Sequence, residues 1–171
     1  MSEAAASGGI SFAVLRLPHV YGPRSLGFKM LRDGRLFLPG SGKCIYSHLH
    51  VTDAARALIT CAEKEFDEIS PIGDSQPATW ADFISVIRTY YPSAKVLVLP
   101  EWLALAGTTA LMPFRRFRPH PGMETPGAVR SYNCNIAVKP GLVWEDLGLK
   151  PKYPSIYEGI PAVVKELNAM A

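Results

Sequence analysis

The feature that most constrains this chain is an apolar segment near its start that stops at a proline. Residues 10–17 read ISFAVLRL, in which only Ser11 and Arg16 are polar. A continuous apolar run with β-branched and aromatic members is typical of a strand covered on both faces, as in a parallel sheet. Pro18 ends the run because it has no N–H for the ladder, and the Tyr-Gly-Pro of residues 21–23 is a tight turn. We therefore expect an internal strand of a larger sheet.

Downstream, strand-like and helix-like segments alternate, which indicates an α/β fold. Strands are predicted at 36–39, 45–51, 69–73 and 95–100, with a short extended piece at 130–134. Helices are predicted at 26–33, 54–65, 80–91, 102–112, 142–148 and 155–168. In the second strand, residues 46, 48 and 50 would share one face, and Thr52 or Asp53 would cap the helix after it. Residues 1–9 are interpreted as a flexible leader, residues 10–171 as the folded domain, and the proline-rich residues 113–128 as a loop.

Composition excludes several classes of protein. Of the 171 residues, 48% are hydrophobic and 19% are charged, so the chain can bury a core and is not intrinsically disordered. The net charge of +3 is too small to indicate a nucleic-acid partner. The three cysteines are widely spaced and form no Cys-x-x-Cys pair, so we expect no disulfide framework and no zinc site. This usage predicts a reducing intracellular compartment, cytoplasmic or peripheral to an organelle membrane.

The segment at 102–118 has two interpretations. Residues 102–114 read WLALAGTTALMPF, which is shorter than the roughly 20 residues needed to span a bilayer. RRFR follows at 115–118. An apolar helix ending in a basic, aromatic cluster could lie at a membrane surface. Alternatively, the helix is buried and its arginines interact with the negative end of its dipole.

Five segments, in order, resemble a known family. They are ISFAVLRLPHVYGPRS, GFKMLRDGRLFLPGSGK with HLHVTDAARALITCAE, IGDSQPATWADFISVI, VLVLPEWLALAG and LVWEDLGLKPKYPSIYEGI. This series is similar to the C-terminal, substrate-binding half of the extended short-chain dehydrogenases/reductases, in the NAD-dependent epimerase/dehydratase superfamily. The stretch ETPGAVRSYNC and the apolar helix after LPEW are nearest its 3β-hydroxysteroid and sterol dehydrogenase branch. The resemblance implies an incomplete Rossmann-type fold: the last parallel strands plus a small mixed α/β substrate-binding lobe.

The family's cofactor loop and catalytic pair have no counterpart where they are expected. The sequence contains no GxxGxxG, and no Tyr-x-x-x-Lys stands just before the strand at 10–17. The resemblance thus implies no catalytic residue here, and NAD or NADP would bind only if an N-terminal half completed the fold. We expect the chain alone to be inactive, with a Rossmann-half chain or another subunit covering strand 10–17.

The resemblance also implies candidate binding residues. Pro18, His19 and Val20 would run beside the nicotinamide, or simply form a strand-ending loop. Four side chains would contact substrate, and they are Tyr21, Phe28, His48 and Arg130. Each has a structural alternative: a turn for Tyr21, a solvated side chain for Arg130, and packing for the histidines, since His48 and His50 have no third metal ligand nearby.

Tyr46 bears on the class of substrate. Nucleotide-sugar members of the family usually carry, at this place, an arginine that pairs with the diphosphate. The tyrosine argues for an apolar substrate instead. Two functions therefore stay open: the substrate-binding portion of a 3β-hydroxysteroid/sterol-type oxidoreductase, or a non-catalytic accessory subunit that docks to a partner chain or a membrane surface.

Overall fold

The computed structural model describes residues 13–34, 36–64, 66, 68–117, 125–139 and 142–170. These residues form two compact units. Unit 1 contains the described residues up to Pro23, Ser47–Pro77, and those from Ala137 onward. Unit 2 contains the described residues of Arg24–Tyr46 and Ala78–Ile136. Each unit is described by itself.

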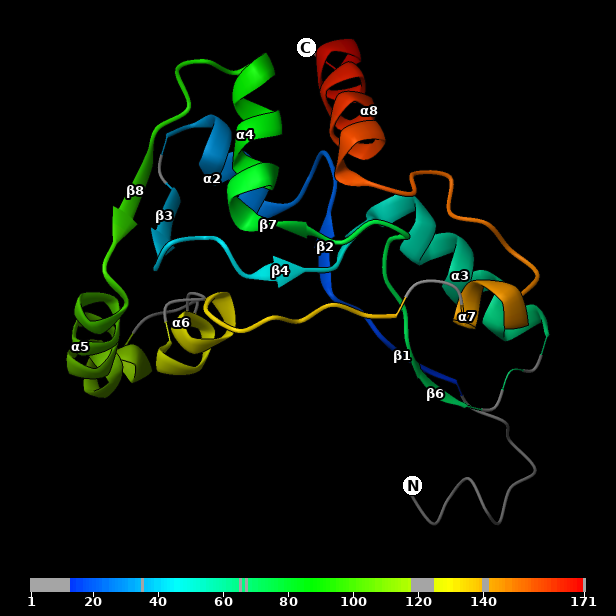
Figure 1. Cartoon of the computed structure of the whole chain (residues 1–171), viewed down its shortest axis with the longest axis horizontal. Helices are drawn as coiled ribbons and strands as arrows, with labels where there is room; N and C mark the ends of the chain where they lie inside the picture. The colour runs from blue at the N-terminus through cyan, green and yellow to red at the C-terminus, as the bar shows by residue number, and fades with distance from the viewer. Residues whose placement is uncertain are drawn as a thin grey trace. The chain divides into compact units, whose positions relative to one another are not determined.

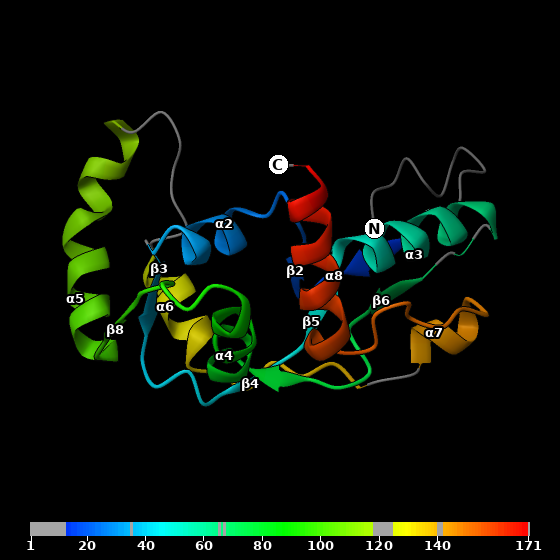
Figure 2. The ribbon, with the colours of Figure 1, turned by 90° about the horizontal axis from the view of Figure 1, so that it is seen from above.

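Unit 1 is built on two pairs of parallel strands (Figure 1). β1 (Val14–Arg16) pairs with β6 (Ile69–Pro71), and β2 (His19–Tyr21) pairs with β5 (His48–His50). The helices described in this unit are α3 (Val51–Glu63), α7 (Leu142–Asp146) and α8 (Ile156–Ala169). Figure 2 shows α8 beside β2 and β5.

The core of unit 1 lies between β5, α3 and α7. Its buried members are Leu49, Ala54, Ala57, Cys61, Ile72, Val143, Trp144 and Leu147. Cys61 on α3 is a buried free thiol. The indole Nε1 of Trp144 donates to the carbonyl of Gly73 at 2.8 Å, so this large side chain is buried without leaving its N–H unpaired.

Unit 2 contains a parallel and an antiparallel strand pair. β3 (Leu36–Pro39) runs parallel to β8 (Val96–Leu99), and β4 (Ile45–Tyr46) is antiparallel to β7 (Ala78–Thr79). The helices are α2 (Leu26–Arg32), α4 (Trp80–Tyr90), α5 (Glu101–Leu111), the 3-10 helix η1 (Met112–Phe117) and α6 (Pro126–Tyr132). α5 packs against α6 (Figure 1).

The predicted fold class is confirmed: strands and helices alternate, and three of the four strand pairs are parallel among the described residues. Local signals place most boundaries. Thr79 and Asp82 form a capping box at the start of α4, and Gly148 has a positive φ of 63° just after α7. None of the described helices is long and apolar enough to cross a membrane.

Three predictions need correction. The extended piece at 130–134 is wrong, because α6 occupies Pro126–Tyr132 and the side chain of Thr125 caps it. The loop predicted at 113–128 includes η1 and the first turn of α6, while 118–124 lie outside the described residues. The single strand predicted at 45–51 is two strands in different pairs, divided by Ser47. Residues 1–9, interpreted as a leader, also lie outside the described residues.

The first strand was expected to be an internal strand of a larger sheet that these residues do not supply. Within this chain, Val14 is 40% and Leu17 is 41% exposed. Among the described residues, β1 pairs only with β6. Residues 10–12 of the predicted strand lie outside the described part. The exposure follows from the small pair, because two strands cannot cover an apolar run that is patterned for a larger sheet.

Candidate functional site

The parallel pairing of β2 and β5 brings three of the predicted site residues together. The register sets His19 beside His48 and Tyr21 beside His50. Residues two apart in a strand point to the same face, so His19 and Tyr21 face the same side as the two histidines of β5. The sequence predicted His19, Tyr21 and His48 as binding residues, and the fold places them in one cluster of unit 1. We call His19, Tyr21, His48, His50 and Asp74 the β2–β5 cluster.

The two imidazoles of this cluster share a hydrogen bond. Nδ1 of His19 lies 2.9 Å from Nδ1 of His48, with the rings edge to face. One nitrogen must donate and the other accept, so the contact excludes both rings being doubly protonated at once. Burial lowers the pKa of His19 to about 4, which keeps this ring neutral near pH 7.

A second contact within the cluster joins Tyr21 to His50. The two rings meet edge to face with centroids 5.4 Å apart, and the ring of His50 also lies 4.2 Å from that of Tyr153. Burial first, and then the nearby carboxylates led by Asp74, raise the pKa of Tyr21. Burial likewise lowers the pKa of His50. Both side chains are therefore uncharged near neutral pH.

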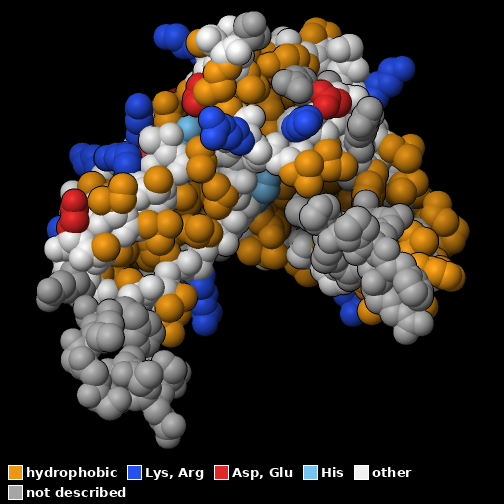
Figure 3. Space-filling view, turned by 180° about the vertical axis from the view of Figure 1, so that it is seen from behind, with side chains coloured by type: hydrophobic (Ala, Val, Ile, Leu, Met, Phe, Trp, Pro, Cys, Tyr) orange, Lys and Arg blue, Asp and Glu red, His pale blue; other side chains and the backbone are white. Residues whose placement is uncertain are grey.

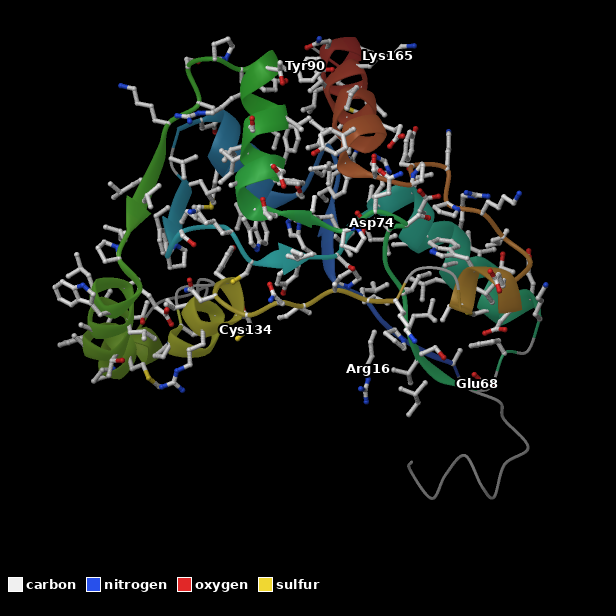
Figure 4. The ribbon with its side chains drawn as sticks, in the orientation of Figure 1. Arg16, Glu68, Asp74, Tyr90, Cys134 and Lys165 are labelled. Carbon is white, nitrogen blue, oxygen red and sulfur yellow. The ribbon has the colours of Figure 1, made fainter. Side chains whose placement is uncertain are left out.

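Asp74 is the acidic member of the cluster, and it follows β6 in the loop that Figure 4 shows near the start of α3. Its Oδ1 accepts the backbone N–H of His48 at 3.1 Å, and its own N–H donates to the carbonyl of His48. The other oxygen, Oδ2, is buried without a hydrogen-bond partner among the described residues. Burial raises the pKa of Asp74 to about 7, so the carboxyl titrates near neutral pH.

Asp53 holds the neighbouring segments in place and is not the predicted helix cap. Its two oxygens accept the backbone N–H groups of Lys152 and Tyr153, both at 2.8 Å, and Arg56 pairs with it at 2.9 Å. The cap is instead His50, whose Nδ1 accepts the N–H of Thr52. Asp53 thereby fixes Tyr153 against the ring of His50.

Most side chains of the cluster are buried within this chain, since Tyr21, His48, His50 and Asp74 are at most 2% exposed. His19 and His50 are held neutral by burial, and no group of His, Cys, Asp or Glu suited to a metal ion occurs in the described part of the chain. A buried carboxyl that titrates near neutral pH can accept or donate one proton. The described residues supply no activated nucleophile beside it.

The other predicted residues are placed differently. Val20 packs against the core of unit 1, and Pro18 is half-buried in the connection between β1 and β2. Phe28 belongs to unit 2, where it is 2% exposed and its ring contacts Tyr91 edge to face. Arg130 is exposed on α6 of unit 2. Phe28 is thus a core side chain, and Arg130 agrees with its alternative as a solvated residue.

An aromatic cluster in unit 2 did not emerge from the sequence as a group. Trp80 at the start of α4 lies 5.5 Å from the ring of Tyr46 on β4 and 4.8 Å from that of Tyr132 on α6. Burial raises the pKa of both tyrosines. The three residues are 34 or more positions apart, so only the pairing of β4 with β7 and the helical state of α6 bring them together.

One Tyr-x-x-x-Lys spacing does occur, at Tyr91 and Lys95. It does not follow the family's helical arrangement. Tyr91 follows the last residue of α4 with a backbone that is not helical, Pro92 comes next, and Lys95 is exposed immediately before β8. Without a helical turn between them, the two side chains are not set on one face as neighbours. This spacing therefore does not supply the acid–base pair.

Comparison with known proteins supports the resemblance for part of the chain. Residues 1–72 match the NAD dependent epimerase/dehydratase family. A search of curated proteins found no matching sequence. The resemblance predicted from the motifs is confirmed: the chain has the fold of this superfamily and, over those residues, its sequence pattern.

Solved structures agree with this assignment. UDP-glucose 4-epimerase from Thermotoga maritima is 21% identical, with a TM-score of 0.62 over 97% of this chain and 48% of that one. Pal from Bacillus thuringiensis is 13% identical, with a TM-score of 0.65 over 98% and 49%. dTDP-glucose 4,6-dehydratase from Bacillus anthracis is 18% identical, with a TM-score of 0.60 over 96% and 47%. The chain spans about half the length of each.

Proposed function

We propose that this chain forms the substrate-binding side of an NAD(P)-dependent oxidoreductase that acts on an apolar secondary alcohol of the 3β-hydroxysteroid or sterol type. The cofactor loop and the catalytic Tyr and Lys come from a segment outside these residues. Hydride would pass between the alcohol carbon and the nicotinamide that this segment binds. The tyrosine and lysine of the segment would accept or donate the hydroxyl proton. Pro18, His19 and Val20 would border the nicotinamide, and of these three only His19 belongs to the β2–β5 cluster.

The proposed class of substrate is supported by the side chains around Tyr46. Tyr46 stands where nucleotide-sugar members of the family carry a diphosphate-binding arginine. It packs against Trp80, which also contacts Tyr132. Flat aromatic faces favour a rigid hydrocarbon ring system over a dianionic diphosphate. A fully ionised diphosphate beside this cluster would meet no bidentate cation at Tyr46.

A binding experiment tests this proposal directly. A fluorescent sterol is titrated into the purified chain, and energy transfer from tryptophan reports binding in a Trp102→Phe background, which leaves the buried Trp80 and Trp144 as donors. We expect saturable binding of the sterol and none of UDP-glucose. Tyr46→Arg should weaken sterol binding by about tenfold, because a cation replaces an apolar face.

The control is Tyr90→Arg, an equivalent change on an exposed residue of α4, which should leave binding unchanged. Tighter binding of UDP-glucose than of sterol by the unmodified chain would overturn the substrate assignment. In the same preparation we expect no NAD(P)-dependent turnover of the sterol. Measurable turnover would show that the acid–base pair lies within these residues.

A second candidate function rests on the exposed strand β1. The apolar side chains of Val14, Leu17 and Ile69 are between 40% and 52% exposed around this pair of strands. An unpaired, apolar strand edge favours association with another chain. A non-catalytic accessory subunit that docks through β1 would have the same exposed edge. This second function would be favoured if the chain failed to bind sterol but associated strongly with another chain.

A further inference from the structure

Two cysteines of unit 2 lie on neighbouring segments, although these segments are 90 positions apart in the sequence. Cys44 immediately precedes β4, and Cys134 lies two residues after the end of α6. The chain that follows Cys134 runs parallel to β4, since Tyr46 is bridged to Ile136. Continuing this parallel register back by two residues sets Cys44 opposite Cys134.

Hydrogen bonds hold the two segments together next to the cysteines. The N–H of Ile136 donates to the carbonyl of Ile45 at 2.8 Å. The N–H of Ile45 donates to Oδ1 of Asn135, also at 2.8 Å. Ile45 and Asn135 are the residues that directly follow Cys44 and Cys134, so the backbone is anchored immediately beside both thiols.

This register suits a disulfide. Opposite residues of neighbouring strands lie about 5 Å apart, within the roughly 4.4–6.8 Å that a disulfide requires between its Cα atoms. Residues two apart in an extended segment point to the same side, so Cys44 shares the side of Tyr46. Burial first, and then the nearby Cys134, raise the pKa of Tyr46, which places Cys134 on that side too.

Reagents in solution can reach this pair. Both thiols are free, and Cys134 is exposed while Cys44 is half-buried. Figure 4 shows Cys134 at the end of α6, beside the chain that leads into β4. An exposed thiol with a second thiol opposite it is the arrangement of a reversible redox pair.

We propose that Cys44 and Cys134 form a reversible disulfide that fixes β4 to the chain after α6. The oxidant is a small disulfide, such as oxidised glutathione. The thiolate of Cys134 attacks one sulfur of this disulfide and releases the first glutathione thiolate. The thiolate of Cys44 then attacks Sγ of Cys134 and releases the second. Two protein thiols are thereby oxidised to one disulfide, and their protons pass to the two glutathione thiols that form.

The bond would act on the aromatic cluster of unit 2. Tyr46 lies two residues after Cys44, Tyr132 lies two residues before Cys134, and both rings contact Trp80. Closing the bond therefore limits the movement of both tyrosines around the indole. The disulfide does not depend on the proposed substrate, since it follows from the register of the two segments.

Mass spectrometry tests for the bond after the chain is incubated with reduced and oxidised glutathione. The unmodified chain is compared with Cys61→Ala, which removes the buried third thiol. In both we expect a product two hydrogen atoms lighter than the reduced chain, with peptides joined through Cys44 and Cys134. This product should exceed the mixed disulfide with glutathione by at least about tenfold, because the opposite thiol has a high effective concentration.

Cys134→Ser is the matched control, because it removes one exposed thiol and keeps a side chain of similar size. This variant should form a mixed disulfide with glutathione and no intrachain disulfide. An intrachain disulfide in Cys134→Ser would mean that Cys44 pairs with Cys61, and it would overturn the proposal. An unmodified chain whose thiols stay free, or stop at the mixed disulfide, would do the same.

The oxidation has to be carried out on dilute protein. Figure 3 shows hydrophobic side chains gathered where α5 and β8 of unit 2 reach the surface, and Leu97 and Trp102 are 62% and 70% exposed there. Within this chain, α5 is therefore not the buried helix of the alternative interpretation. Exposed apolar side chains favour contact between copies. A non-reducing gel separates the intrachain product from a linked dimer, and a dimer as the main product would contradict the proposal.

Hydrogen exchange shows whether the bond fixes β4. The amides of Ile45 and Ile136 donate the hydrogen bonds between the two segments, so each exchanges only when this contact opens. Both should exchange at least about fivefold more slowly in the oxidised than in the reduced Cys61→Ala chain. The amide of Ile72 in unit 1, which donates to the carbonyl of Arg16, should be unaffected. Equal rates at Ile45 and Ile136 in the two forms would show that the disulfide does not hold β4 in place, and the proposal would be wrong.

Discussion

At the scale of the residue, the β2–β5 cluster sets two opposite titrations next to each other. Asp74 has a pKa raised to about 7 by burial, so the folded protein binds its proton more tightly than the unfolded chain. His19 has a pKa lowered to about 4 by burial, so the folded protein binds that proton less tightly. Their contributions to stability therefore change in opposite directions between about pH 4 and pH 6.5.

This opposition gives a prediction for Asp74→Asn. The contribution of Asp74 to stability is complete below pH 4 and is lost as the pH rises through about 7, a change of a few kcal/mol. The contribution of His19 is complete above pH 6.5 and is lost on acidification. With Asp74→Asn, the free energy of unfolding should fall on acidification from about pH 6.5 to pH 4 without the opposing gain.

Urea denaturation at several pH values measures this. The control is Asp146→Asn, which alters an exposed carboxyl on α7 and should leave the pH profile of the unmodified chain unchanged. Asparagine keeps an oxygen for the N–H of His48, so the variant should still fold. If the profiles of Asp74→Asn and the unmodified chain coincide, Asp74 does not titrate in this range in the folded protein.

At the scale of the element, the sequence predicted those helix boundaries that neighbouring residues determine. The capping box at Thr79, the stop at Gly148 and the extent of α8 all follow from short-range patterns. The partner of each strand does not, because β3 pairs with β8 across about 60 residues, and no local signal specifies that choice. Ser47 illustrates this limit: the 45–51 pattern reads as one strand, yet its hydroxyl accepts the N–H of Val138 and the chain changes partner there.

In the candidate site, too, some features could be predicted from the sequence and others could not. The family motifs gave His19, Tyr21 and His48 as candidate binding residues one by one, and the register of β2 with β5 places them side by side. Asp53 read as a cap because aspartate before a helix usually is one, but a distant segment with two free backbone N–H groups competes for its oxygens. The aromatic cluster and the role of Asp74 depend on residues far apart in the chain, which periodicity cannot detect.

The contact between α8 and β2 gives a prediction at this scale. Gly159 is buried in α8, and a Cβ at this position would overlap the hydroxyl end of Tyr21. Gly159→Ala should therefore lower the free energy of unfolding by about 2 kcal/mol, because the packed ring has to move. In a Tyr21→Phe background the loss should be smaller, since the nearest atom is the phenolic oxygen.

The matched control is Gly107→Ala in α5. Gly107 also lies inside a helix, but a Cβ there would contact no neighbouring atom within 4 Å. Alanine should stabilise the protein by about 0.5–1 kcal/mol through its higher helix propensity. Thermal or urea unfolding of both variants decides the question. If the two substitutions changed the free energy of unfolding equally, both helices would accept a Cβ atom alike, and Tyr21 would not pack against Gly159.

At the scale of the whole molecule, the exposed strand β1 bears on whether the chain associates. The chain covers about half of each solved neighbour, and β1 carries an apolar run that unit 1 leaves open on one side. Arg16 is the only charge on β1, where it lies opposite Pro71 at the C-terminal end of the strand pair, and Figure 4 shows it pointing away from the two strands. A lone charge at one end does little to prevent pairing along the rest of the edge.

We therefore predict that the purified chain associates through β1 at micromolar concentrations. Sedimentation velocity should show a mean mass that rises with concentration. Leu17→Lys, which adds a charge to the exposed apolar edge, should restore a monomer without lowering stability, since Leu17 is 41% exposed. Leu26→Lys, at a 61% exposed residue of α2, is the control and should associate like the unmodified chain. If the chain were a monomer at all concentrations, the edge of β1 would already be protected within this chain. The prediction that a partner covers β1 would then be wrong.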